Sequence, residues 1–169
     1  MTYQRPEPPY TGSDERTNLV TWLAYHRATL AMKCDGLEDK QLRERAVPPS
    51  ALSLLGLVRH MADVERGWFR RTLAGEDAPP IYYSKEDPNG EFDNVDDADV
   101  AEAFATWRRE CAVADENIAA AESLEVTGKY RTGEEISLRW ILSHMIEEYA
   151  RHNGHADLLR ERIDGVTGE

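Results

Sequence analysis

Glu148 and His152 are the residues of this sequence whose types and spacing most directly suggest chemistry. They are four positions apart, so on a helix they project from the same face, one turn apart. At about 100° per residue, they lie within roughly 60° of the apolar residues Ile141, Met145 and Leu159. A charged carboxylate on an apolar face is costly unless it is paired or coordinated. The pattern therefore predicts either a metal ion or a buried ion pair at Glu148.

A metal site would need a third ligand from another helix, because two side chains of one helix cannot close a tetrahedral site. His60 lies at the edge of a second apolar stripe and could supply it. Two imidazoles and one carboxylate are typical of zinc sites that keep an open position for water or substrate. His144 and His155 flank the same face as supporting groups or alternative ligands. Spacing also leaves open an ion pair of Glu148 that merely fixes helix register.

The composition of the chain excludes several classes of function. A net charge of −12 argues against binding to nucleic acids or anionic membranes, since both need clustered Lys and Arg. No apolar run approaches the ~20 residues of a membrane span, and the first residues lack the apolar core of a secretory signal. The two cysteines, Cys34 and Cys111, have no paired spacing and favour a reducing cytoplasm. We expect neither to be catalytic.

The apolar pattern predicts an all-α protein. Four segments have a helical period, and no strand-like alternation of any length is present. They run from about Asp14 to Lys33, from an N-cap at Ser50 to Trp68, from Val100 to Ala121, and from Ser137 to Ile163. Four amphipathic helices in one small domain predict a four-helix bundle. We expect residues 1–169 to form this single domain, with residues 1–13 as an extended N-terminal arm.

A long connection between Gly75 and Val95 separates the second and third helices. Connections of this length are often lids or binding loops, and this one would let the two helices run parallel. Tyr82 and Tyr83 are therefore candidates to fold over the mouth of a pocket, although a solvated acidic crossover is an equal alternative. The candidate pocket walls by helical position are Trp68, Trp140 and Tyr149.

Two helical motifs, LGLVRHMADVE and EEYARHNGHADLL, resemble the DinB-like superfamily, and most closely its short actinobacterial-type proteins. The resemblance covers nearly the whole chain and implies a four-helix bundle in up-down-down-up order. Many members hold a divalent metal with one residue of the second helix and two of the fourth, spaced by four. His60 and His152 match two of these positions. Glu148 stands where many members have His, and resembles the His, Glu, His set of mycothiol-dependent members.

The resemblance also implies a function. Several relatives are S-transferases that use bacillithiol or mycothiol, so we predict a metal-dependent thiol S-transferase in detoxification or stress response. Zinc is the expected ion, with nickel or another transition metal as the alternative, and a homodimer is the expected assembly. Maleylpyruvate isomerase relatives have an additional C-terminal domain that we do not expect in 169 residues. A metal-dependent hydrolase and a non-catalytic bundle that binds a small apolar ligand are the alternatives; no general base is identified.

Overall fold

The computed structural model describes residues 5–167, which are mostly helical, as the all-α prediction requires. The helices are α1 (Glu15–Cys34), α2 (Asp39–Arg43), α3 (Leu54–Glu65), the π-helix η1 (Arg66–Leu73), α4 (Gly90–Asp93), α5 (Val100–Ala120) and α6 (Leu138–Asp164). Residues 1–4 of the expected N-terminal arm lie outside the described residues, and residues 5–14 belong to no helix or strand. Within the described range, no helix is long and apolar enough to cross a membrane.

Side-chain caps set the starts of the long helices. Each capping side chain accepts a hydrogen bond from the backbone N–H three residues further on, which satisfies a free donor of the first turn. The capping residues are Asp14, Ser53, Asp99 and Ser137. The predicted N-cap at Ser50 is wrong, because the Ser50 hydroxyl instead accepts the N–H of Leu52 in a turn. At the other end of the chain, Gly165 terminates α6 with a left-handed backbone (φ 78°).

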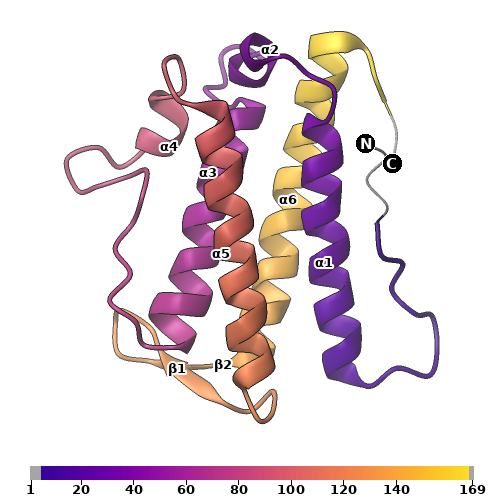
Figure 1. Ribbon diagram of the computed structural model, residues 1–169, viewed down its shortest axis with the longest axis vertical. Helices are drawn as coiled ribbons and strands as arrows, with labels where there is room; N and C mark the ends of the chain where they lie inside the picture. Colours follow the sequence, from indigo (N-terminus) through magenta and orange to yellow (C-terminus); the bar gives the residue numbers. More distant parts are fainter. Residues whose placement is uncertain (1–4, 168–169) are drawn as a thin grey trace.

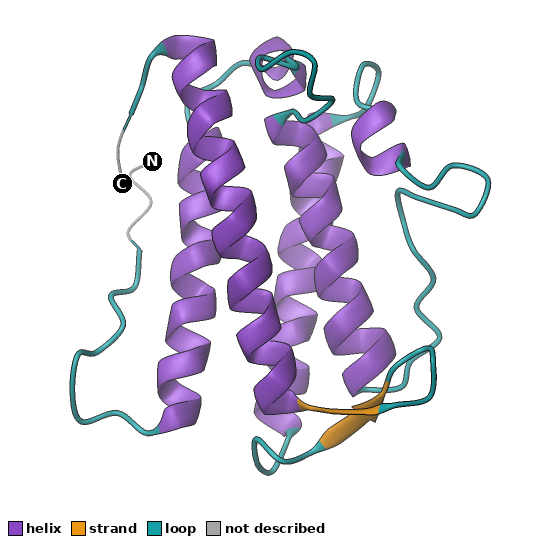
Figure 2. Cartoon of the chain, turned by 180° about the vertical axis from the view of Figure 1, so that it is seen from behind, coloured by secondary structure: helices purple, strands orange, loops and turns teal. Residues whose placement is uncertain are grey.

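The long helices α1, α3 with η1, α5 and α6 lie side by side in Figures 1 and 2. Helix α1 packs chiefly against α6, and α3 packs chiefly against α5. The contact between α3 and α6 is the one that concerns function, since these two helices hold the predicted metal ligands. Fully buried side chains fill the interior; among them are Leu23, Leu30, Leu57, Met61, Ile141 and Met145.

A short antiparallel hairpin corrects the expectation of no strands. Strands β1 (Thr127–Lys129) and β2 (Glu135–Ser137) pair directly before α6, and their three residues each are too few for alternation to be recognised. Gly128 of β1 lies against the end of η1, where a Cβ atom would clash with the carbonyl of Thr72. The hairpin is therefore fitted closely onto the end of η1, below the long helices in Figure 1.

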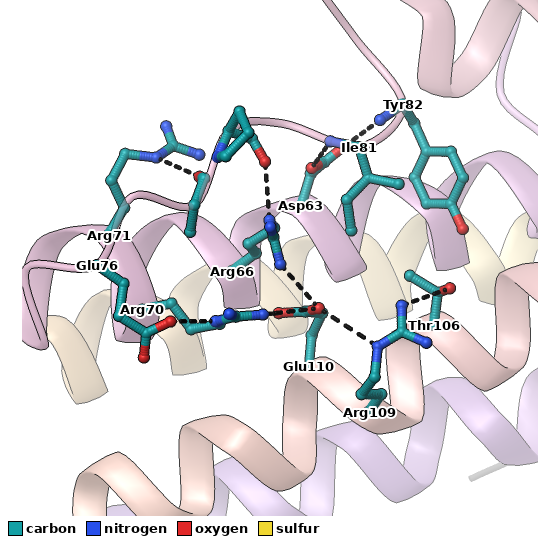
Figure 3. A network of polar contacts seen from close by, with 12 residues as sticks. Asp63, Arg66, Arg70, Arg71, Glu76, Ile81, Tyr82, Thr106, Arg109 and Glu110 are labelled. Atoms are coloured by element: carbon teal, nitrogen blue, oxygen red, sulfur yellow. Dashed lines mark hydrogen bonds and ion pairs between the residues drawn. The ribbon is translucent and has the colours of Figure 1, made fainter.

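The crossover, residues 74–99, connects η1 to α5 and contains the short α4. Asp63 accepts hydrogen bonds from the backbone N–H groups of Ile81 (2.7 Å) and Tyr82 (2.9 Å). Nε of Arg66 donates to the backbone carbonyl of Pro79 (2.8 Å), and Nε of Arg71 donates to that of Ala78 (3.0 Å), as Figure 3 shows. These four bonds fasten the crossover to α3 and η1, so this part of it is a fixed wall and not a free lid.

Candidate metal centre

His60 of α3 and the pair Glu148 and His152 of α6 converge in the structure. One ligand atom from each residue lies within 4.8 Å of the others. The Nε2 atom of His152 is 3.5 Å from Oε2 of Glu148, and the rings of His60 and His152 are 4.7 Å apart between centroids. The structure therefore brings together the three residues that the sequence suggested as ligands.

These three residues lie at the edge of the core. Their side chains are 23%, 18% and 12% exposed for His60, Glu148 and His152 respectively. The fully buried face of α6 passes instead through Met145 and Tyr149. Partial exposure leaves room for an ion with an open coordination position, which a site closed within the core would not have.

Burial gives His152 the electronic state that a metal ligand needs. Removal of the ring from water, together with the neighbouring charges of His60, His155 and Arg151, lowers the pKa of His152 to about 3. The imidazole is consequently neutral across the ordinary pH range, with a lone pair free to bind a cation. The carboxylate of Glu148 supplies the negative charge of the set.

Glu91 of α4 supports His60 from outside the group of ligands. Its Oε1 atom lies 3.4 Å from Nδ1 of His60, and the rest of its carboxylate is buried. A proton on Nδ1 would face this carboxylate and leave Nε2 of His60 free for a metal, as in many carboxylate–histidine–metal arrangements. Sequence reasoning missed Glu91, because only the length of the crossover hinted that this segment reaches the site.

His144 and His155, the other two histidines of α6, contact the candidate ligands but are not part of the three-residue cluster. Nε2 of His144 lies 3.6 Å from Oε1 of Glu148, and Nδ1 of His155 lies 3.3 Å from Nδ1 of His152. Both therefore lie where the sequence suggested supporting groups, outside the three-residue cluster.

A cavity of about 340 Å³ opens beside His60. Of the predicted pocket residues, Trp68 and Tyr83 line it. The ring of Trp68 is nearly parallel to that of Tyr130 (9°), with centroids 5.2 Å apart. Trp140 is 47% exposed and packs on Trp68 without lining the cavity. The cavity thus combines an aromatic wall with a potential metal ligand.

Tyr82 and Tyr149, two other predicted pocket residues, do not line the cavity beside His60. The Tyr82 ring packs under the Arg59 guanidinium (4.5 Å), and its hydroxyl donates to Glu102. Tyr149 is fully buried and donates a hydrogen bond to Glu65 (2.7 Å), so it belongs to the core. Neither tyrosine is among the residues that line the cavity beside His60.

The two cysteines are free thiols in surroundings that disfavour ionisation. Burial raises the pKa of Cys34 to about 12, and burial followed by the charge of Glu65 raises the pKa of Cys111 well above its usual value. A nucleophilic cysteine needs a lowered pKa. Any thiolate chemistry at this site therefore requires a thiol brought in by a substrate.

A comparison with known families matches residues 18–165 to the model of the mycothiol-S-transferases. The chain belongs to this family. Mycothiol-S-transferase is a DinB-like family, so the resemblance noted in the two helical motifs is confirmed. The match includes His60, Glu91, Glu148 and His152. A search of curated proteins found no match.

Proposed function

We propose that this protein is a metal-dependent S-transferase that joins a low-molecular-weight thiol, mycothiol according to its family, to a small electrophile. The convergence of His60, Glu148 and His152 beside a cavity is the observation that carries the proposal. A family match over residues 18–165 supports the choice of thiol. The role would be detoxification or stress response in a reducing cytoplasm.

The residues fit a divalent ion. Two imidazoles and one carboxylate are ligands that zinc prefers, and the three ligand atoms lie close enough for one ion. His152 is held neutral, and Glu91 contacts Nδ1 of His60, which leaves Nε2 for the ion. Zinc is the ion that we expect, with nickel or another transition metal as the alternative.

A divalent ion bound there would lower the pKa of a coordinated thiol, so that thiolate is present at neutral pH. The chain supplies the rest of the chemistry by orientation. His60, Glu148 and His152 would hold the ion that binds the sulfur, while Trp68 and Tyr130 form an aromatic wall beside the electrophile. Overall, the thiol S–H bond breaks and its proton goes to solvent. A C–S bond forms at the electrophilic carbon as the leaving group departs with its bonding electrons.

The proposal includes the architecture of the family. The long helices would form a DinB-like four-helix bundle in up-down-down-up order, as one domain over residues 1–169. Two copies would pair through helix faces, and the exposed parts of α1, where Trp22 is 39% exposed, and of α5 are the candidates. Light scattering tests the dimer, and a mass of 19.2 kDa at every concentration would contradict it.

The function is tested by a transfer assay on protein purified without a histidine tag. Mycothiol and a panel of other thiols are each offered with a panel of electrophiles, before and after chelation. We expect the thiol to be consumed with mycothiol in the metal-loaded protein, and activity to be lost on chelation and in Glu148→Gln. Glu147, the exposed residue next to Glu148, provides the matched control: Glu147→Gln should stay active. Substrate turnover that consumes no thiol would contradict the proposal and favour a hydrolase.

A further inference from the structure

The cavity beside His60 has a cationic wall that thiol activation does not explain. Arg71 of η1 lines it together with Lys129 and Arg131 from the β1–β2 hairpin. These three cations gather on one cavity in a chain whose net charge is −12. Such a concentration of positive charge favours an anionic ligand.

The acidic residues that line the same cavity are Asp63 and Glu91, and three of their four carboxylate oxygens have partners. Both carboxylate oxygens of Asp63 accept backbone N–H groups of the crossover (2.7 and 2.9 Å). Glu91 contacts Nδ1 of His60 with one oxygen, and its other oxygen is buried without a hydrogen-bond partner among the described residues. Lys129 forms no ion pair with any residue in the range 5–167, so these carboxylates do not neutralise it.

Arg71 differs from the two other arginines of η1. Arg66 and Arg70 both face the fully buried carboxylate of Glu110, at 3.1 and 3.3 Å. Arg71 points away from that carboxylate, as Figure 3 shows, and its Nε donates to a crossover carbonyl. Its Nη2 atom is buried beside Gly67 and has no hydrogen-bond partner among the described residues. A buried donor without a partner is costly, and a shift of this side chain toward an anion in the cavity would satisfy it.

The aromatic wall indicates what kind of anion fits. Trp68 and Tyr130 present nearly parallel rings at the cavity, and the volume of about 340 Å³ suits a small organic molecule. The two rings stack on each other, so a flat or apolar body would pack beside this aromatic pair while its charged end meets Arg71. Because His60 lines the same cavity, a molecule held in this way lies next to the proposed metal ligands.

We infer that the cavity binds the electrophilic co-substrate, and that this co-substrate is an organic anion with an apolar or aromatic body and a carboxylate. Arg71 donates to the carboxylate from within the cavity, and Lys129 and Arg131 add positive charge at its rim. The role as co-substrate rests on the proposed S-transferase function. The anion site itself needs no metal.

The test compares naphthoate with naphthamide, which have the same aromatic body with and without the charge. Quenching of tryptophan fluorescence measures the Kd of each for protein whose metal has been removed by chelation and dialysis, so that no ion can bind the carboxylate. We expect naphthoate to bind at least about tenfold more tightly than naphthamide, as a charge-assisted contact in a cavity should allow. In Arg71→Met, this ratio should fall below about threefold.

Arg151→Met is the matched control, because Arg151 is an exposed arginine of α6 outside the cavity. Its ratio should equal that of the unmodified protein. Arg71 also braces the crossover, so the double variant Lys129→Met/Arg131→Met provides a second test at exposed positions, and its ratio should fall by at least about twofold. Equal binding of both probes by the unmodified protein would overturn the inference, as would an unchanged ratio in a folded Arg71→Met.

The result is separable from that of the transfer assay. Loss of the S-transferase proposal with a retained preference for naphthoate would leave an anion site of another function and overturn only the co-substrate role. Thiol transfer without any preference for naphthoate would overturn the anion site and leave the proposed function intact.

Discussion

Replacement of Arg27 by Met tests the buried ion pair that ties together the helices of the site. Arg27 of α1 donates from Nε and Nη2 to both oxygens of Glu65, each at 2.7 Å. Glu65, the last residue of α3, is fully buried, and it also accepts a hydrogen bond from Tyr149 of α6 (2.7 Å). One carboxylate therefore links α1, α3 and α6.

The size of the effect follows from the burial of Glu65. Without Arg27, the Glu65 carboxylate keeps two partners within residues 5–167, the Tyr149 hydroxyl and the weak Cys111 thiol. Breaking one side of a buried pair costs about 3–5 kcal/mol, because the remaining charge is left uncompensated. Arg27 also contacts Asp115, but that side chain is 62% exposed and its pairing adds little. We expect Arg27→Met to lose about 4 kcal/mol of the roughly 5–15 kcal/mol that stabilises a domain.

Urea unfolding of the metal-free protein, followed by circular dichroism, measures this loss. The control is the double variant Arg27→Met/Glu65→Gln, in which an uncharged amide can still accept the Tyr149 hydrogen bond. It should recover at least about 1 kcal/mol relative to Arg27→Met, since no buried charge remains. A loss below about 1 kcal/mol for Arg27→Met would refute the reasoning, because the Glu65 charge would then not depend on Arg27.

Three other features of the molecule give predictions about stability. Gly128→Ala should destabilise the fold by about 1–3 kcal/mol in urea unfolding, because its Cβ would clash with the Thr72 carbonyl. Asp63→Ala should release the crossover, and trypsin should then cleave after the exposed Lys85 faster than in the unmodified protein; equal rates would contradict the bracing role. In the metal-free protein, His152 has a folded-state pKa of about 3, below its usual 6.5. The contribution of neutral His152 to the free energy of unfolding is therefore complete above pH 6.5 and is lost as the pH falls toward 3, by about 2 kcal/mol at pH 5. In urea unfolding across this pH range, His152→Gln should lack this part of the pH dependence.

The helices could be predicted because their signals are local. Asp99 caps a regular apolar repeat that starts at Val100, and α5 follows this repeat. The start of α3 was misplaced, since Ser50 and Ser53 are both hydroxyl residues before the same apolar run and only the path of the chain chooses between them. The π-helix after Glu65 and the short hairpin depend on tertiary contacts, which periodicity does not report.

The candidate site divides in the same way. Glu148 and His152 could be paired from their spacing, because a helix fixes which residues share a face. Tyr149 is the next residue after Glu148, and the turn of about 100° between them places it in the core and not in the pocket. Glu91 and Arg71 acquire their roles from the fold of the crossover and of η1, so no local pattern could have identified them.

Zinc binding by Glu148→Gln tests the central claim most directly. Competition with a chromophoric chelator gives the zinc affinity of the unmodified protein, of Glu148→Gln and of the control Glu147→Gln, whose carboxylate is 57% exposed on the same helix. The account predicts one zinc per chain, a loss of at least about a hundredfold in Glu148→Gln, and a change within about twofold in the control. Zinc binding by Glu148→Gln that equals that of the unmodified protein would contradict it.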